Sequence, residues 1–467
     1  MKKQKKDLGH FRIAEDSMGK MKIPKEMLYG ASTQRAVLNF PISGRRFPRS
    51  FIHALGQIKM SAAKANAKLR LLTSGQAQAI EKAAREVRDG QWDEHFVLDI
   101  FQTGSGTSTN MNANEVIASL ANQSLQLSSD SKNRIHPNDH VNKGQSSNDV
   151  IPTAIHVSVL LQLRDHLIPE LKKLQTALLK KARKFHPIFK IGRTHLQDAT
   201  PIRLGQEFGG YAEQVKKAIE RVEKCFPSLR ELAIGGTAVG TGINTHPLFA
   251  REVCDDLNRE LGEKVFEARN HFEAQAAKDA CVEASGTLKV VAVSLLKIAN
   301  DIRWLSCGPR AGIAELKLPE VQPGSSIMPG KVNPVMAEAM MQVACEVIGN
   351  DLAVTLAAQH GNFELNVMMP VMVYNLLESI RLLSNAVSVF RSKCVDGIQD
   401  DRMRCESVIE KTLMLSTPLV PVIGYDRAAQ VAKEAYRTGK TIRQVVLEKR
   451  LLGEKQLSRI LDIKKMV

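Results

Sequence analysis

The chain has 467 residues, of which 5% are aromatic and seven are cysteine. Its 65 lysines and arginines exceed its 49 aspartates and glutamates by 65 − 49, which gives a formal net charge of +16. This length fits two or three domains or one large helical body, and the low aromatic content favours helix over sheet. The cysteines form no Cys-x-x-Cys pair, which argues against disulfides and an iron–sulfur cluster, and the dispersed positive charges accompany no RNA-binding or zinc-finger motif, which disfavours a nucleic-acid partner.

The chain begins with MKKQKKDLGHF, which lacks the apolar stretch of a signal peptide, and acidic residues follow early. We therefore expect a cytoplasmic protein. Residues 1 to about 50 are expected to be irregular, with the phrase DSMG at 16–19. Helices are predicted at 52–70 and 75–88. The polar run QTGSGTSTNMNAN at 102–114 then precedes a helix that extends to about residue 125.

A second polar loop, RIHPNDHVNKGQSSND, occupies 134–149. Apolar residues then recur every three or four positions from Ile155 to Leu178, which predicts a long amphipathic helix that Pro169 kinks. The loop GRTHLQDATP at 192–201 leads into a predicted helix at about 205–225. A glycine-rich turn, GGTAVGTGINT, precedes a short helix at 247–261.

Three further long helices are predicted at about 273–305, 334–359 and 367–395, and the first is apolar on nearly every face, so we expect it to be buried. Charged residues interrupt the other two, so neither is expected to span a membrane. The resulting fold class is all-α, a central five-helix bundle between smaller terminal domains. The expected boundaries are 1–143 for an N-terminal helical domain, 144–401 for the bundle and 402–467 for a small C-terminal helical domain.

Four polar loops, at 102–114, 134–149, 192–201 and 324–334, carry more hydrogen-bond donors than a simple connection requires. A small dicarboxylate is the natural ligand for so many donors. The last loop, GSSIMPGKVNP, combines two hydroxyls, a cation and an amide between glycines and prolines. Asn333 is expected to cap a helix that begins at Pro334 and directs its positive end at the bound anion.

His195 is the obvious titrating group in these loops, because its ordinary pKa lies near 6.5. Ser325 could act as a base only with help from Lys331, nearby amides and a helix end. Glu338 lies among alanines and methionines, where an unpaired carboxylate is costly, so we expect it to pair with His195.

Two other motifs have less specific interpretations. His136, Asp139 and His140 could bind a metal, but a single cluster is weak support, and a hydrogen-bonded loop or a secondary anion contact fits better. GGTAVGTGINT is interpreted as a tight turn between packed helices, because no strand precedes it as a dinucleotide-binding loop would require.

The motif GSSIMPGKVNP resembles the signature of the fumarase/aspartase superfamily. The stretches TGSGTSTNMN, GQSSNDVIPTA and GRTHLQDATP resemble those of class II fumarases, as do GGTAVGTGINT, GNFELNV and IGYD, so the resemblance covers nearly the whole chain. Aspartases usually have STND and RTQLQD, where this chain has Ser147 and His195. The resemblance therefore implies reversible hydration of fumarate to L-malate, a hydro-lyase reaction of the tricarboxylic acid cycle, with aspartate ammonia-lyase as the alternative.

The resemblance also implies a mainly helical homotetramer with no cofactor or metal, whose active sites are each built from three chains. Ser325 would be the base, Lys331 and Asn333 would stabilise the carbanion, and His195 with Glu338 would handle the water. The implied substrate-binding residues are Ser105, Gly106, Thr107, Ser146, Ser147, Asn148, Thr194, Ser326, Lys331, Val332 and Asn333.

A second anion site of the family matches at His136, Pro137, Asn138 and Asp139. The arginine expected three positions before His136 is replaced by Asn133, with Arg134 beside it, which puts this second site in doubt. Two hypotheses of other classes are a non-catalytic structural member of the superfamily and a nucleic-acid-binding protein. The first leaves the joint presence of Ser325, Lys331 and His195 unexplained, and the second rests on net charge alone.

Overall fold

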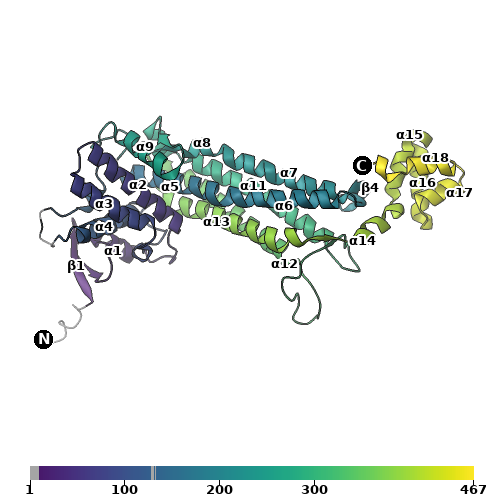
Figure 1. Cartoon of the computed structure of the whole chain (residues 1–467), viewed down its shortest axis with the longest axis horizontal. Coiled ribbons are helices and arrows are strands. Elements are labelled where there is room, and N and C mark those ends of the chain that lie inside the picture. The colour runs from purple at the N-terminus through teal and green to yellow at the C-terminus, as the bar shows by residue number, and fades with distance from the viewer. Residues whose placement is uncertain (1–9, 128–130, 132) are drawn as a thin grey trace. The chain divides into compact units, whose positions relative to one another are not determined.

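A computed structural model describes residues 10–127, 131 and 133–467 and shows a mainly helical chain, as predicted (Figure 1). The chain divides into two compact units, each assembled from three segments. The first unit contains residues 1–168, 220–290 and 345–383, and the second contains residues 169–219, 291–344 and 384–467. Both units thus draw on the long helices, and the predicted three-domain division stays a prediction.

The first unit begins with an antiparallel hairpin, β1 (Phe11–Asp16) and β2 (Gly19–Pro24), followed by α1 (Ala31–Asn39). The prediction that residues 1 to about 50 are irregular was therefore wrong over most of the described part. DSMG forms the hairpin turn, and residues 1–9 lie outside the described part of the chain. Both strands are half exposed, so their apolar alternation is too weak to stand out from the charged residues around it.

Three helices follow in the first unit: α2 (Arg49–Lys68), α3 (Ser74–Arg88) and α4 (Thr107–Ser124). The predicted pair at 52–70 and 75–88 is confirmed. Thr73 begins α3 with a capping box, in which its hydroxyl accepts from the backbone N–H of Gln76 and the Gln76 side chain reciprocates. A π-helical turn, η2 (Pro137–Val141), then leads to α5 (Ser147–Gln162).

The remaining elements of the first unit are short, apart from α9. They are the 3₁₀ turn η1 (Asp93–His95), the π-turn η3 (Leu163–Leu167), α8 (Phe226–Leu229), α9 (Phe249–Leu261), α10 (His271–Ala276), and the two-residue strands β5 (Glu231–Leu232), β6 (Phe266–Glu267), β8 (Gly361–Asn362) and β9 (Leu365–Asn366). The π-turn ends at Leu167, two residues before Pro169, which agrees with the predicted interruption of the long helix.

The second unit contains almost all of α6 (Ile168–Phe185) and the antiparallel hairpin of β3 (Phe189–Thr194) and β4 (Gln197–Arg203). The prediction that 192–201 is a loop was therefore wrong. Four long helices have residues in both units: α7 (Leu204–Lys224), α11 (Asp279–Leu305), α12 (Val335–Ala358) and α13 (Met369–Lys393). These match the predicted helices to within a few residues, except that the predicted 273–305 helix is divided between α10 and α11.

The C-terminal part of the second unit has its own small apolar core, formed by ten buried residues between Leu415 and Leu461. The remaining elements of the second unit are β7 (Leu316–Lys317), β10 (Gln399–Asp400), α14 (Arg402–Ser407), α15 (Val420–Ile423), α16 (Tyr425–Thr438), α17 (Ile442–Glu448), α18 (Glu454–Ile460) and the 3₁₀ turns η4 (Val395–Gly397), η5 (Ile409–Lys411), η6 (Leu413–Leu419) and η7 (Ile463–Lys465). The predicted helical character of residues 402–467 is confirmed.

The surfaces of the long helices are more apolar than a lone chain requires. Val290 and Val293 on α11 are 39% and 52% exposed, so the prediction that this helix is buried is wrong in part for the chain by itself. Within the described residues, none of the helices is both long enough and apolar enough to cross a bilayer.

Candidate functional site

The loop at 324–334 is closed on itself by contacts between its two ends. The side-chain amide nitrogen of Asn333 donates to the carbonyl of Gly324. A Cβ at Gly324 would lie only 1.9 Å from the carbonyl oxygen of Lys331, so only glycine fits there. The expected cap by Asn333 is replaced by this contact, and α12 begins at Val335, one residue later than predicted.

Ser325 occupies a position where negative charge on its oxygen is stabilised. Its Oγ accepts hydrogen bonds from the backbone N–H groups of Ile327, at 3.2 Å, and Met328, at 3.0 Å. Hydrogen bonds to the charged form of a group favour that form, so this pair of donors makes the hydroxyl easier to deprotonate. The neighbouring Ser326 and Lys331 are exposed, and both are available to a ligand.

His195 lies at the tip of the β3–β4 hairpin. Thr194 pairs with Gln197 across the strands, which leaves a two-residue turn of His195 and Leu196. Both turn residues have positive φ, 54° and 57°, as a type I′ turn demands. This conformation is unusual for residues other than glycine, asparagine, aspartate or histidine, so the strain lies chiefly at Leu196, and such backbone strain is often found at functional positions. The turn presents the His195 ring as an exposed group.

A buried network of four charges holds the base of this hairpin. The ammonium of Lys190 lies 2.8 Å from a carboxylate oxygen of Glu207 and 2.9 Å from one of Glu315. Arg193 donates to the other oxygen of Glu315 at 2.8 Å. Lys190 and Glu315 are almost completely buried. The strand that carries Thr194 and His195 is therefore anchored to α7 and to the segment before β7.

Within one chain, the described residues show no hydrogen bond or ion pair between His195 and Glu338. Glu338 lies in the first turn of α12, where its backbone N–H donates to the carbonyl of Pro334. The proposed pairing of His195 with Glu338 thus stays a prediction.

The first unit brings together the donors of two other polar loops. The hydroxyl of Thr107 lies 2.8 Å from that of Ser105 and 2.6 Å from that of Ser147. Thr107 is the first residue of α4 and Ser147 the first of α5, so the N-terminal ends of both helices meet at this contact. Helix N-termini favour anions, and hydroxyls beside them can donate to a carboxylate. This cluster is a candidate carboxylate site.

The surrounding residues fix these two helix ends. Ser146 caps α5, its hydroxyl accepting from the N–H of Asn148, and the Asn148 side chain donates to the carbonyl of Ala238 in the glycine-rich turn at 2.8 Å. Gly106 precedes α4 with a φ of 71°, which suits glycine. The prediction of a loop through residue 114 was wrong after Gly106, because Thr107–Asn114 already belongs to α4.

The segment GNFELNV supports the same cluster. The carbonyl of Gly104 accepts from the N–H of Met369 at 3.1 Å, and a Cβ at Gly104 would lie 1.7 Å from the carbonyl oxygen of Val367. The backbone of the Ser105 loop therefore contacts the last residue of this motif, Val367, and Met369 just after it.

The candidate second anion site lies in and beside η2, with its side chains engaged locally. Nδ1 of His136 accepts from the N–H groups of Asn138 and Asp139 and lies 3.2 Å from the Asp139 carboxylate. Nδ1 of His140 accepts from the N–H of His136. The hydrogen-bonded loop suggested by the sequence fits this arrangement. No group of three or more potential metal ligands is assembled among the described residues.

Sequence reasoning overlooked a buried polar group behind the Ser147 cluster. Lys59 of α2 is fully buried and donates to the side-chain oxygens of Asn142 and Gln145, both at 2.9 Å. Burial lowers the pKa of Lys59 to about 7, although Asp149 opposes this. Burial also raises the pKa of Asp149 to about 6, while N–H donors from Ser146, Thr237 and Gly235 oppose it. Its neighbours Ile58 and Met60 are apolar, but a single lysine in an apolar stretch gives no sequence signal of burial.

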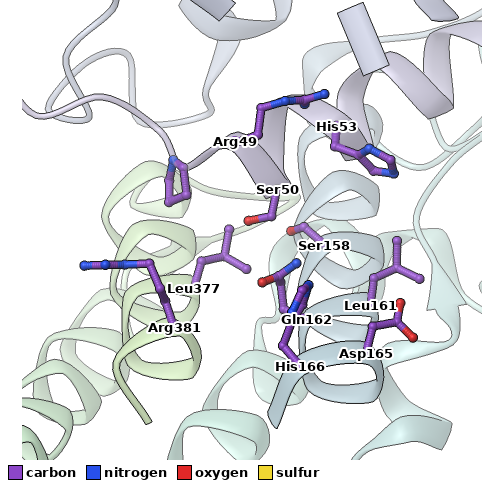
Figure 2. A pocket seen from close by; sticks show the side chains of 11 residues that line it. Arg49, Ser50, His53, Ser158, Leu161, Gln162, Asp165, His166, Leu377 and Arg381 are labelled. Carbon is purple, nitrogen blue, oxygen red and sulfur yellow. The ribbon is translucent and has the colours of Figure 1, made fainter. Parts of the chain in front are cut away.

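The first unit also contains a pocket of about 470 Å³ between α2, α5, η3 and α13 (Figure 2). None of the predicted site residues lines it. Its two arginines are already engaged, Arg49 with Asp93 and Arg381 with Glu378.

Comparison with known proteins gives consistent matches over nearly the whole chain. Residues 19–349 match a family described as lyase, and residues 415–467 match one described as the fumarase C C-terminus. The chain is 49% identical to a class II fumarate hydratase of Xylella fastidiosa (strain Temecula1 / ATCC 700964), covering 99% of this chain and 96% of the relative. It is 50% identical to a class II fumarate hydratase of Mycobacterium tuberculosis (strain ATCC 25618 / H37Rv), covering 98% and 96%.

The fold is similar to that of a solved structure, the recombinant class II fumarase from Schistosoma mansoni. The TM-score is 0.96 at 40% identity, covering 98% of this chain and 99% of that one.

Proposed function

Because the chain belongs to the class II fumarase family of lyases, we propose that it catalyses the reversible addition of water across the double bond of fumarate to give L-malate. The observation that carries this proposal is the similarity at about half identity over the full length of relatives that are named for this reaction. The retained Ser147 and His195 favour this activity over ammonia release from L-aspartate.

In the dehydration direction, Ser325 is the base. Its deprotonated Oγ takes a proton from the carbon next to one carboxylate of L-malate, and the electron pair of the broken C–H bond spreads onto that carboxylate. The two N–H donors on Oγ support this role because they stabilise the alkoxide that must form first. Lys331 and Asn333 electrostatically stabilise this carboxylate, which then carries two negative charges. Asn333 uses one N–H on Gly324 and keeps the other for substrate.

His195, oriented by Glu338, completes the reaction on the opposite face. It gives a proton to the hydroxyl group as the C–O bond breaks, and fumarate and water leave. An exposed ring at the tip of a firmly anchored hairpin suits a group that must reach a substrate held elsewhere. In the hydration direction the same imidazole removes a proton from water.

The carboxylates of the substrate are held by the donor cluster and by residues of the two catalytic loops. The proposed carboxylate-binding residues are Ser105, Gly106, Thr107, Ser146, Ser147, Asn148, Thr194, Ser326 and Val332. The meeting of the α4 and α5 N-termini at a 2.6 Å hydroxyl contact supports this assignment. His136, Pro137, Asn138 and Asp139 form the proposed second anion site.

We propose that the active form is a homotetramer with shared sites, without a cofactor or metal. Ile348, Leu352 and Leu356 lie on one face of α12, at four-residue spacing, and are 37%, 60% and 51% exposed. Such an apolar face normally packs against another helix, and a second copy of the chain would supply one. All seven cysteines are free within the described part of the chain, which supports the proposed cytoplasmic location.

The proposal can be tested by incubating fumarate with the purified protein in deuterium oxide. Base and acid on opposite faces predict L-malate with one deuterium on carbon, present as a single diastereomer by proton NMR. Formation of both diastereomers would contradict the assigned geometry, and no malate would contradict the function.

A further inference from the structure

A fully buried lysine is linked by hydrogen bonds to the segments that carry the proposed carboxylate site. Lys59 is 0% exposed, and within the described part of the chain its Nζ donates only to neutral oxygens, those of the Asn142 and Gln145 side chains. Burying an ammonium group costs free energy unless it is paired with a carboxylate, so the stability of the fold alone does not explain a lysine at this position.

Asn142 connects Lys59 to the helix that begins with Thr107. Its Oδ1 accepts from Lys59 and also from the side-chain amides of Asn110 and Asn114 in α4, both at 3.2 Å. Its Nδ2 donates to the backbone carbonyl of Gln145 at 3.0 Å. One amide side chain thus joins three segments: α2, α4 and the loop that leads into α5.

The hydrogen-bonded group around Asn142, called the hub here, lies close along the chain to the hydroxyls proposed to bind the substrate. Asn110 lies three residues after Thr107, and Gln145 lies two residues before Ser147. The hub therefore holds both helix ends within one turn of the 2.6 Å contact between Thr107 and Ser147. A change in the hub would alter the spacing of these two hydroxyls.

The carboxylate of Asp149, near the start of α5, is held by its own set of hydrogen bonds. Asp149 is completely buried, and its carboxylate accepts backbone N–H groups from Ser146, Gly235 and Thr237 at 2.9 to 3.0 Å. Asp149 thus holds the other side of the α5 N-terminus to the glycine-rich turn. Lys59, through Gln145, and Asp149, through the glycine-rich turn, both hold the N-terminal end of α5 in place.

We propose that Lys59 is a positioning residue, which sets the relative placement of the α4 and α5 N-termini so that Thr107 and Ser147 bind one carboxylate of the substrate. This inference rests on the proposed function of the site. Lys59 acts through Asn142 and Gln145 and does not itself contact the substrate.

The test compares Lys59→Met with Lys181→Met, a matched control in the second unit. Lys181 is also buried, at 8% exposure, and also donates to two oxygens, the carbonyls of Asp396 and Ile398. Both variants should lose thermal stability. Only Lys59→Met should raise the KM for L-malate and the Kd of succinate, the latter measured by calorimetry. We expect a rise of about tenfold, the usual effect of one lost buried hydrogen-bond partner. The kcat should change less than about threefold. The proposal would be overturned if Lys59→Met and Lys181→Met had the same KM for L-malate and the same Kd for succinate.

A second variant keeps the test decisive if Lys59→Met does not fold. Gln145→Ala removes one acceptor of Lys59 at a half-buried position and should raise KM and the succinate Kd by about threefold or more. Unchanged constants would overturn the proposal. A wild-type chain that binds succinate but does not convert L-malate would refute the hydratase function alone, because the comparison of succinate Kd values still tests the role of Lys59.

Discussion

Replacing Gly324 by alanine tests whether the closed form of the 324–334 loop is needed for catalysis. The added Cβ would lie 1.9 Å from the carbonyl oxygen of Lys331, whereas ordinary contact begins at 3.4 Å. The two ends of the loop must therefore separate by 3.4 − 1.9 = 1.5 Å. Displacement of a catalytic group by about 1 Å can cost about 100-fold in rate. We expect kcat for L-malate to fall about 100-fold, because Ser325 is attached directly to Gly324.

Gly330→Ala in the same loop is the control. Gly330 has a φ of +77° but nothing within 4 Å of its Cβ position, so alanine there adds backbone strain of about 1–2 kcal/mol without a collision. We expect kcat within about fivefold of wild type. Steady-state rates of fumarate formation, with thermal unfolding measured in parallel, give both results. Nearly equal kcat values for Gly324→Ala and Gly330→Ala would refute the argument that loop closure places Ser325.

Three further predictions concern the catalytic pair, acid stability and metals. Ser325→Ala and His195→Asn should each reduce kcat strongly with the oligomer intact in gel filtration, and subunits of the two variants mixed by reversible dissociation should regain activity; no recovery would argue against shared sites. Burial lowers the pKa of His156 from 6.5 to about 4, so its contribution to stability is complete above pH 6.5 and is lost as the pH falls toward 4. This amounts to about 3 kcal/mol, and urea unfolding of His156→Gln should show a correspondingly weaker loss between pH 7 and pH 4. Dialysis against a chelator should leave wild-type kcat unchanged, and a loss that a divalent cation restores would contradict metal independence.

The long helices could be predicted because each carries its signal locally. Apolar spacing located α2, α3, α7, α12 and α13 to within a few residues, since every helix of this length must bury one face. The polar loops also stood out locally, because so many donors in a short stretch require a ligand.

The second hairpin that was missed, β3–β4, depends on contacts distant in sequence. The hairpin carrying His195 has no Asn-Gly or Asp-Gly turn signal. Its strained His195-Leu196 turn is supported by the strand that precedes it, in which Lys190 forms ion pairs with Glu207 and Glu315. Glu315 lies more than a hundred residues from the strand that it anchors. No local pattern could reveal that support.

The carboxylate cluster was predicted in composition but not in arrangement. The sequence indicated that Thr107 and Ser147 belong to donor-rich loops, yet it could not show that both are first residues of helices whose ends meet. Lys59 was overlooked because a single lysine in an otherwise apolar helix is normally interpreted as an exposed side chain. Its burial becomes evident only when Asn142 and Gln145 are brought to it by the fold.

The most direct test of the proposed activity is a comparison of L-malate and L-aspartate as substrates for the purified protein, with chelator present and with fumarate and ammonia both measured. The proposed mechanism predicts rapid formation of fumarate from L-malate and no release of ammonia from L-aspartate. Turnover of L-aspartate alone, with ammonia released, would contradict it.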